Sequence, residues 1–260
     1  MRVGIISGSG TDEWPALADP VPELRTTPHG EVRVTHGAVG GTEVVHVARH
    51  GPEHVRLSNH VDHRANMAAL LDARVDCLVS TTVCGALDPA LPLGSLVVFD
   101  DLYFPSNRLP DGELCTLFSE PGGKGRGHWI FDRPFSEELR RALAHGAAEI
   151  GVASSAGCYG HVDGPRFNSR TEIAALAALG VRAVSQTAGP EVVLAGEAGL
   201  PMALVGYTTD YANAVADRPE PVEALGARMA QSTVVFSALV AATVPRIGEL
   251  EVSGSVHRFG

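Results

Sequence analysis

Short apolar runs alternate with helix-patterned segments along almost the whole chain, and this alternation restricts the possible folds more than any other feature. Residues 3–6 form an apolar run that ends in a glycine turn, whereas residues 62–72 repeat their apolar side chains at helical spacing. Strands that alternate with helices favour an α/β fold with a mixed or mainly parallel sheet. No linker interrupts the pattern, so we expect one domain over residues 1–260. The expected strands are 3–6, 31–35, 43–48, 77–80, 96–99, 181–185 and 202–207, and the expected helices are 62–72, 136–150, 169–179, 190–198 and 222–242.

One stretch, residues 105–127, follows neither pattern and is dense in Gly and Pro. We expect a long surface excursion there. Long loops in compact domains are usually functional or lie at an interface.

The charge balance excludes some partners. The chain has 30 acidic and 20 basic residues, a formal net charge of −10, and no cluster of Lys or Arg such as a nucleic-acid backbone requires. No apolar stretch approaches the roughly 18 residues of a membrane span, and the chain opens directly into a strand rather than a signal peptide. We therefore expect a cytoplasmic protein that binds neither nucleic acid nor membrane.

The cysteines and histidines do not form a metal-ligand pattern. His50 and His54 are four residues apart with Glu53 between them, but they follow a strand and do not lie on a helix as zinc-protease ligands do. The cysteines lack paired spacing, so we expect reduced thiols and no metal site. They are Cys77, Cys84, Cys115 and Cys158.

Polar loops follow several of the expected strands. Ser7-Gly8-Ser9-Gly10 lacks the Lys of a P-loop, and Arg49-His50-Gly51 combines a fork of donors with a glycine. Thr81, Thr82 and Thr187 add hydroxyl groups at other strand ends. Taken singly, these are a surface Arg-His pair and a plain tight turn. Taken together at the carboxyl ends of strands, where α/β folds place their chemistry, they predict a site for inorganic phosphate.

These loops belong to a longer series of motifs, and the series resembles the nucleoside phosphorylase family, closest to the 5′-methylthioadenosine phosphorylases. The most specific of the motifs is Gly164-Pro165-Arg166-Phe167. The others are Ser7-Gly8-Ser9-Gly10, Thr27-Pro28-His29-Gly30, Arg49-His50-Gly51 with His54, Arg64-Ala65-Asn66, Thr81-Thr82-Val83-Cys84-Gly85, Pro190-Glu191-Val192-Val193-Leu194-Ala195 and Thr209-Asp210-Tyr211. The resemblance covers almost the whole chain. It implies a single-domain phosphorylase fold with a mixed central sheet flanked by helices. It also implies a homotrimer that uses inorganic phosphate as co-substrate and needs no metal or organic cofactor.

The resemblance also assigns roles to individual residues. Asp210 would be the catalytic residue, donating a proton toward N7 of the purine, which requires that its carboxyl hold one. Phosphate would be held by Ser9, Arg49, His50, Thr82 and Thr187. The nucleoside would contact Val83, Phe167, Gln186, Asp210, Leu225 and Met229, together with His128 lent by a neighbouring subunit.

Four of these residues have simpler interpretations. Phe167 could belong to the core, and Asp210 could cap a helix. For Leu225 and Met229, which share one face of the last helix, spacing alone favours core packing.

Three positions depart from the family pattern. Gln186 stands where the family has Met beneath the ribose, Ala212 replaces an Asp of the methylthioadenosine enzymes, and Asp163 replaces a Glu. The prediction is phosphorolysis of 5′-methylthioadenosine or another 5′-modified adenosine to free adenine and a pentose 1-phosphate. The alternatives are a phosphorylase for 6-oxopurine nucleosides such as inosine or 5′-methylthioinosine, a hydrolytic nucleosidase, and a nucleoside-binding relative without turnover.

Overall fold

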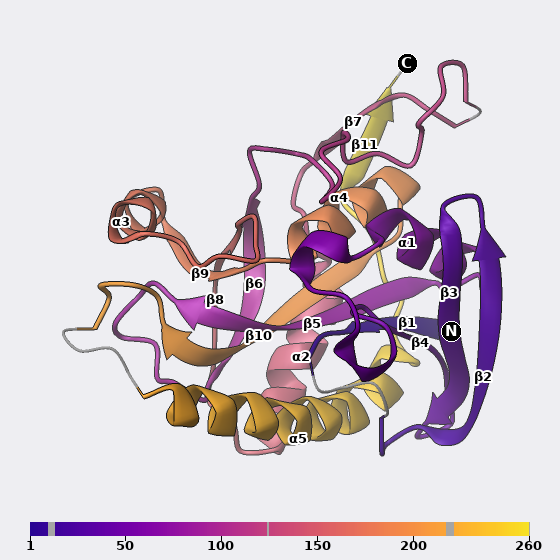
Figure 1. The fold of residues 1–260 in the computed structure, drawn as a ribbon. Coiled ribbons are helices and arrows are strands. Elements are labelled where there is room, and N and C mark those ends of the chain that lie inside the picture. The colour runs from indigo at the N-terminus through magenta and orange to yellow at the C-terminus, as the bar shows by residue number, and fades with distance from the viewer. Residues whose placement is uncertain (10–13, 124, 217–220, 260) are drawn as a thin grey trace.

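The computed structural model describes residues 1–9, 14–123, 125–216 and 221–259, and Gly10 of the first glycine turn lies outside them. Its main sheet is mixed, with helices on both faces (Figure 1). The strands of this sheet, in spatial order, are β10 (Met202–Tyr211), β6 (Leu96–Tyr103), β8 (Ser154–His161), β9 (Val181–Ser185), β5 (Cys77–Ala86), β1 (Arg2–Ser7), β4 (Thr42–Ala48), β3 (Gly30–Val39) and β2 (Ala18–Thr27).

Strand β5 pairs with both β10 and β9, so the strands β10, β6, β8, β9 and β5 close into a ring at one end of the sheet. Strand β1 runs parallel to β4 and β5, with Ser7 opposite Ala48 and Ile6 opposite Ser80. The segments that follow these three strands therefore emerge side by side at one edge. This register positions the polar loops predicted from the sequence.

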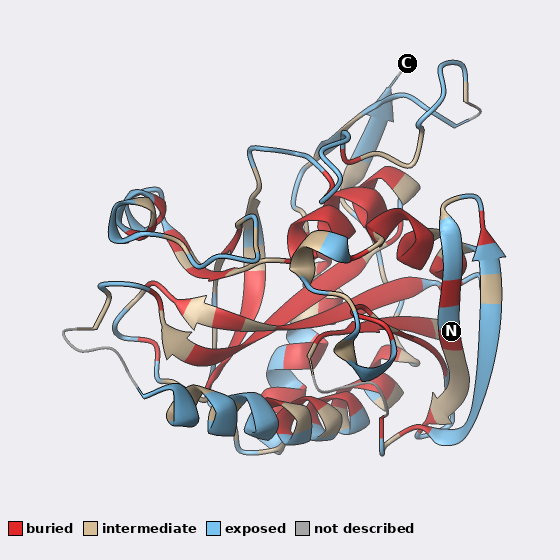
Figure 2. Ribbon diagram, viewed as in Figure 1, coloured by how far each residue is buried: buried red, intermediate tan, exposed pale blue. Residues whose placement is uncertain are grey.

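Two apolar cores lie on opposite faces of the sheet (Figure 2). Because successive side chains of a strand point to opposite faces, Ile6 packs with the first core and Ile5 with the second. Helices α1 (His63–Asp72) and α4 (Ala188–Ala198) cover the first face, and α2 (Glu137–Glu149) and α5 (Val222–Ile247) cover the second (Figure 1). The remaining elements are α3 (Arg170–Ala178), the short 3₁₀ turns η1 (Pro52–His54) and η2 (Ser58–His60), and a separate two-stranded sheet of β7 (His128–Phe131) and β11 (Val256–Phe259).

Helix α5 qualifies one expectation. It has 26 residues and, among the described residues, is the one helix whose length and apolar composition would allow it to cross a membrane. No such stretch was predicted from the sequence. Its side chains Phe236, Leu239 and Val240 are buried in the second core, which accounts for the apolar composition.

The structure extends several expected elements and adds others. Residues 81–85, expected as a loop, belong to β5, and β10 continues past residue 207 to include Asp210. Strands β2, β7, β8 and β11 were not predicted. Their side chains are mostly exposed or small and polar, so they lack the alternating or continuous apolar pattern of a buried strand. Apart from residue 124, the stretch 105–127 contains turns and one isolated bridge between Arg108 and Leu114.

The four cysteines are free thiols, and burial raises the pKa of each. The pKa reaches about 12 for Cys77 and Cys115 and about 11 for Cys158. These thiols are therefore protonated at neutral pH and are poor nucleophiles.

Candidate functional site

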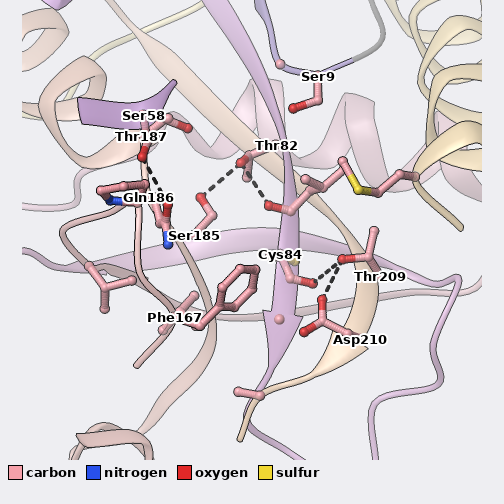
Figure 3. A pocket seen from close by; sticks show the side chains of 18 of the residues that line it. Ser9, Ser58, Thr82, Cys84, Phe167, Ser185, Gln186, Thr187, Thr209 and Asp210 are labelled. Atoms are coloured by element: carbon pink, nitrogen blue, oxygen red, sulfur yellow. Dashed lines mark hydrogen bonds between the residues drawn. The ribbon is translucent and has the colours of Figure 1, made fainter. Parts of the chain in front are cut away.

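A cavity of about 320 Å³ opens where β1, β4, β5, β9 and β10 end or pass. At one end of it lie Ser9, Thr82 and Thr187, and at the other lie Phe167 and Asp210 (Figure 3). The predicted site residues that line it are Ser9, Arg49, His50, Thr82, Val83, Phe167, Gln186, Thr187, Asp210, Leu225 and Met229.

Arg49 is the most constrained residue of the cavity, since only 1% of its surface is exposed. Its Nη2 donates to Oε2 of Glu191 at 2.9 Å and to Oγ of Ser80 at 2.8 Å, its Nη1 donates to the carbonyl oxygen of Thr81 at 3.1 Å, and its Nε donates to Oε1 of Glu191. A guanidinium has five N–H groups. Four of the five N–H groups of Arg49 donate to the described residues, so one N–H on Nη1 is left for a ligand.

Two glycines give a ligand access to this end. A Cβ on Gly8 would lie 2.9 Å from Nη1 of Arg49, so only glycine lets the turn after β1 approach the guanidinium this closely. Gly51 has φ +73°, a left-handed conformation that favours glycine, and it turns the chain immediately after His50.

His50 is held by its backbone contact. Its Nδ1 lies 2.8 Å from the carbonyl oxygen of Arg56, and its ring stacks on that of His54 with centroids 4.1 Å apart. The pKa of His50 is lowered to about 3, mainly by burial and in smaller part by the charges of Arg49 and His54. The imidazole is therefore neutral at neutral pH.

Hydroxyl groups complete the same end of the cavity. Oγ1 of Thr82 lies 2.9 Å from Oγ of Ser185, which in turn lies 2.7 Å from the hydroxyl of Tyr159 (Figure 3 shows the first of these bonds). Thr187 is the N-cap of α4, so the partial positive charge of that helix N-terminus points at this region. Several donors and one guanidinium from separate elements suit a small oxyanion.

Comparison with known proteins identifies the family. The model of the phosphorylase superfamily matches residues 2–245. The chain belongs to this superfamily. The phosphorylase is 34% identical to the 6-oxopurine nucleoside phosphorylase of Pyrococcus furiosus, over 81% of this chain and 80% of that relative. It is 32% identical to the S-methyl-5′-thioadenosine phosphorylase of Caenorhabditis elegans, over 81% and 74%. The structure of methylthioadenosine phosphorylase from Schistosoma mansoni in complex with adenine superposes with a TM-score of 0.86 at 28% identity, covering 96% of this chain and 93% of that one.

The opposite end of the phosphorylase cavity is built around Asp210. A register irregularity between Thr208 and Asp210 interrupts the pairing of β10 with β5, and such a bulge redirects a side chain. Oδ1 of Asp210 accepts a hydrogen bond from Oγ1 of Thr209 at 2.7 Å. Gly85, opposite Asp210, leaves space beside the carboxyl, because a Cβ there would lie 3.5 Å from Oδ2. Asp210 lies on a strand, so the helix-cap interpretation is wrong.

The core interpretations of three apolar residues are also wrong. Phe167 is 69% exposed and projects at the cavity (Figure 3). Leu225 is half-buried and Met229 is 36% exposed, and both line the cavity from the first turns of α5. Helical spacing reports that a face is apolar, but it does not distinguish a face that covers a core from one that covers a cavity.

Gln186 connects two segments of the cavity wall. Its Oε1 accepts from Oγ of Ser58 at 3.0 Å, and its Nε2 donates to the carbonyl oxygen of Arg166 at 3.0 Å. The amide that replaces the family's Met therefore ties the η2 segment to the Gly164-Pro165-Arg166-Phe167 loop.

His128 lies outside the cavity of its own chain. It is exposed on β7, where its ring stacks on Phe259 with centroids 5.5 Å apart. Within the described residues, no group of three or more His, Cys, Asp or Glu side chains is placed to hold a metal ion.

Sequence reasoning missed several residues of this region. Glu191 appeared only within a family motif, and its partnership with Arg49 joins positions far apart in sequence. Ser58, Asn168 and Asn213 also line the cavity. Ser58 begins the short η2 turn and the two asparagines lie in loops, so no periodic pattern could have marked these residues.

Proposed function

We propose that this phosphorylase transfers the pentose of a 5′-substituted adenine nucleoside, 5′-methylthioadenosine in the first place, to inorganic phosphate. The observation that carries the proposal is the polarity of the cavity. Ser9, Thr82 and Thr187 lie at one end, and the carboxyl of Asp210 lies at the other (Figure 3). The guanidinium of Arg49 belongs to the first end, because it donates to the carbonyl oxygen of Thr81, the residue before Thr82. The similarity to a methylthioadenosine phosphorylase that binds adenine supports the choice of base.

The chemistry follows from this arrangement. As the C1′–N9 bond breaks, its electron pair moves into the purine and positive charge develops on the sugar ring. A phosphate oxygen positioned opposite C1′ stabilises that charge and then forms the new C1′–O bond. The purine gains one proton, and Asp210 is the carboxyl at its end of the cavity that can deliver it toward N7. Hydrogenphosphate loses one proton as it becomes the sugar ester, and this balances the proton that Asp210 regains from solvent.

The apolar side chains Leu225 and Met229 suit a 5′ substituent such as a methylthio group better than a free hydroxyl. We also propose a homotrimer in which His128 of the partner subunit completes this pocket. The exposed Ile130 and Phe259 of the small β7–β11 sheet are apolar surface that an interface would cover. We further propose a cytoplasmic location, supported by four free thiols, and a reaction that needs no metal or organic cofactor.

A second candidate is phosphorolysis of 6-oxopurine nucleosides. The Pyrococcus furiosus relative carries that name, and Ala212 offers no polar contact beside Asp210 for a 6-amino group.

One assay separates these functions. Base release is measured with 5′-methylthioadenosine, adenosine, inosine and 5′-methylthioinosine, with and without phosphate. We expect adenine from 5′-methylthioadenosine only when phosphate is present, together with an equal amount of pentose 1-phosphate. Release from the inosine compounds alone would overturn the base assignment. Release without phosphate would identify a nucleosidase, and binding without release would identify a binding protein.

A further inference from the structure

A small space at the Asp210 end of the cavity combines a carboxyl with an apolar side. It lies in front of Gly85, where a Cβ would be 3.5 Å from Oδ2 of Asp210 and 3.7 Å from the Cβ of Ala212. Asp210 and Ala212 therefore both border the space that the glycine leaves, and all three residues line the cavity. A ligand edge that reaches the carboxyl across Gly85 also meets the methyl group of Ala212.

The wall that continues from Ala212 is apolar as well. Ala212 belongs to a buried cluster with Ile173 and Val184, and both of these side chains line the cavity. The amide nitrogen Nδ2 of the next residue, Asn213, donates to the carbonyl oxygen of Asn168 at 2.6 Å. The side of the space that Ala212 and its cluster form therefore consists of carbon.

A carboxyl beside an apolar wall treats the two hydrogens of a purine 6-amino group differently. A carboxyl that donates toward N7 through one oxygen can accept the amine hydrogen on the N7 side through the other. Asp210 can therefore serve that hydrogen. The hydrogen on the N1 side loses its water on binding and finds no acceptor on Ala212, which is unfavourable. A methyl group in its place needs no acceptor and gains free energy from burial.

We propose that Ala212 makes the cavity selective for a purine whose 6-amino group carries one methyl group, so that the preferred base is 6-methylaminopurine rather than adenine. The remaining N–H donates to Asp210, and the methyl group packs on Ala212 in front of Gly85. A second methyl group removes the donor, so the dimethylated base is disfavoured. This inference rests on the proposed function, which places the base at the Asp210 end of the cavity.

The experiment measures the binding of free bases to the wild-type phosphorylase by titration calorimetry at neutral pH. Adenine, 6-methylaminopurine, 6-dimethylaminopurine and hypoxanthine are titrated in turn. We expect 6-methylaminopurine to bind at least about fivefold more tightly than adenine, because a methyl group is buried and an unpaired donor is removed. The dimethylated base should bind more weakly than the monomethylated base. Adenine binding as tightly as 6-methylaminopurine, or the dimethylated base binding most tightly, would overturn the inference.

Two substitutions test whether Ala212 is the cause, with adenine as the internal reference in each variant. Ala212→Val fills the space with carbon, so the preference for 6-methylaminopurine should fall to unity or reverse. Ala212→Asp supplies an acceptor for the second amine hydrogen, so adenine should become the preferred base. An unchanged preference in Ala212→Val would show that another residue makes the selection and would overturn the inference.

The same titrations, combined with the base-release assay, separate this inference from the proposed function. If adenine binds and 6-methylaminopurine does not, the inference fails and the proposed function stands. If 6-methylaminopurine is preferred but no nucleoside releases its base in the presence of phosphate, the proposed function fails and the inference stands. Binding of hypoxanthine alone would overturn both.

Discussion

Arg49 and Glu191 form a two-pronged ion pair in which each side chain is about 1% exposed. Burial would raise the pKa of the Glu191 carboxyl, but the charge and hydrogen bonds of Arg49 outweigh it and hold that pKa below its usual value. Ser80 donates a further hydrogen bond to Oε2 of Glu191 at 2.6 Å. The pair fixes the guanidinium after the end of β4 against the first turn of α4, where Arg49 lines the cavity.

Removing one partner of this pair should be costly. Glu191→Gln leaves Arg49 buried without a counter-charge, which typically destabilises a fold by about 3–5 kcal/mol. Urea unfolding measures the loss. The control is Glu149→Gln, which breaks the exposed pair with Arg246 and should cost about 1 kcal/mol or less. Equal losses of unfolding free energy in the two variants would show that the buried pair stabilises the fold no more than an exposed pair does.

Acid should destabilise the fold through buried histidines. Burial lowers the pKa of His46, His50 and His161 to about 3 and that of His63 to about 4, from an ordinary value of 6.5. Below about pH 6.5 the unfolded chain takes up protons that the folded chain refuses, so stability falls as pH falls toward the folded pKa values. Each histidine contributes up to about 1.4 kcal/mol per pH unit.

The measurement is the free energy of unfolding between pH 8 and pH 5. His161→Gln removes one of these histidines, so the slope of the free energy of unfolding against pH should decrease by the contribution of one proton. A stability that stays constant from pH 7 to pH 5 in the wild-type protein would refute the expectation.

Asp210→Asn should separate the two purine classes. The amide cannot deliver a proton, so kcat/KM for 5′-methylthioadenosine should fall by about 10²–10⁴. Activity on the inosine compounds should fall less or rise, because an amide can donate to a 6-oxo group. Asp163→Asn, an exposed carboxyl on the loop before Gly164, is the matched control and should leave both activities near wild type. Parallel loss on both classes would argue against a role of Asp210 at the base.

Replacing Gln186 should loosen the cavity wall. In Gln186→Met both the bond from Ser58 and the bond to Arg166 are lost. Hydrogen exchange should accelerate in the η2 segment and in the 164–168 loop. Ser58→Ala removes one of the two bonds, so exchange should rise around η2 alone. Unchanged exchange in Gln186→Met would show that neither bond restrains the segments.

His128→Ala should lower activity while the free energy of unfolding of the chain stays unchanged, since this side chain is exposed and outside its own cavity. Co-expression with Asp210→Asn tests the shared site. A mixed oligomer contains sites with Asp210 from one variant and His128 from the other, so activity should recover above that of either variant alone. Full activity of His128→Ala by itself would remove its proposed role.

Much of the fold was predictable because its signals are local. Helices α1, α2, α3 and α4 begin and end within two residues of the predicted limits, since apolar spacing and caps such as Ser169 act over a single turn. The glycine and hydroxyl loops were recognisable because they interrupt apolar runs. Strands β2 and β8 were missed because their side chains are exposed or small, and only pairing with distant strands makes them strands.

The sequence by itself therefore determined the order of the elements and the chemical types gathered at the strand ends. Tertiary structure decided which of those groups contact one another and which of them face the cavity. It closed the ring through β5 and β10, paired Arg49 with Glu191, and placed Leu225 and Met229 on a cavity rather than a core. The physical reason is that periodicity and turn chemistry depend on a few neighbouring residues. Burial, ion pairing and access to a ligand depend instead on which distant segments the folded chain brings together.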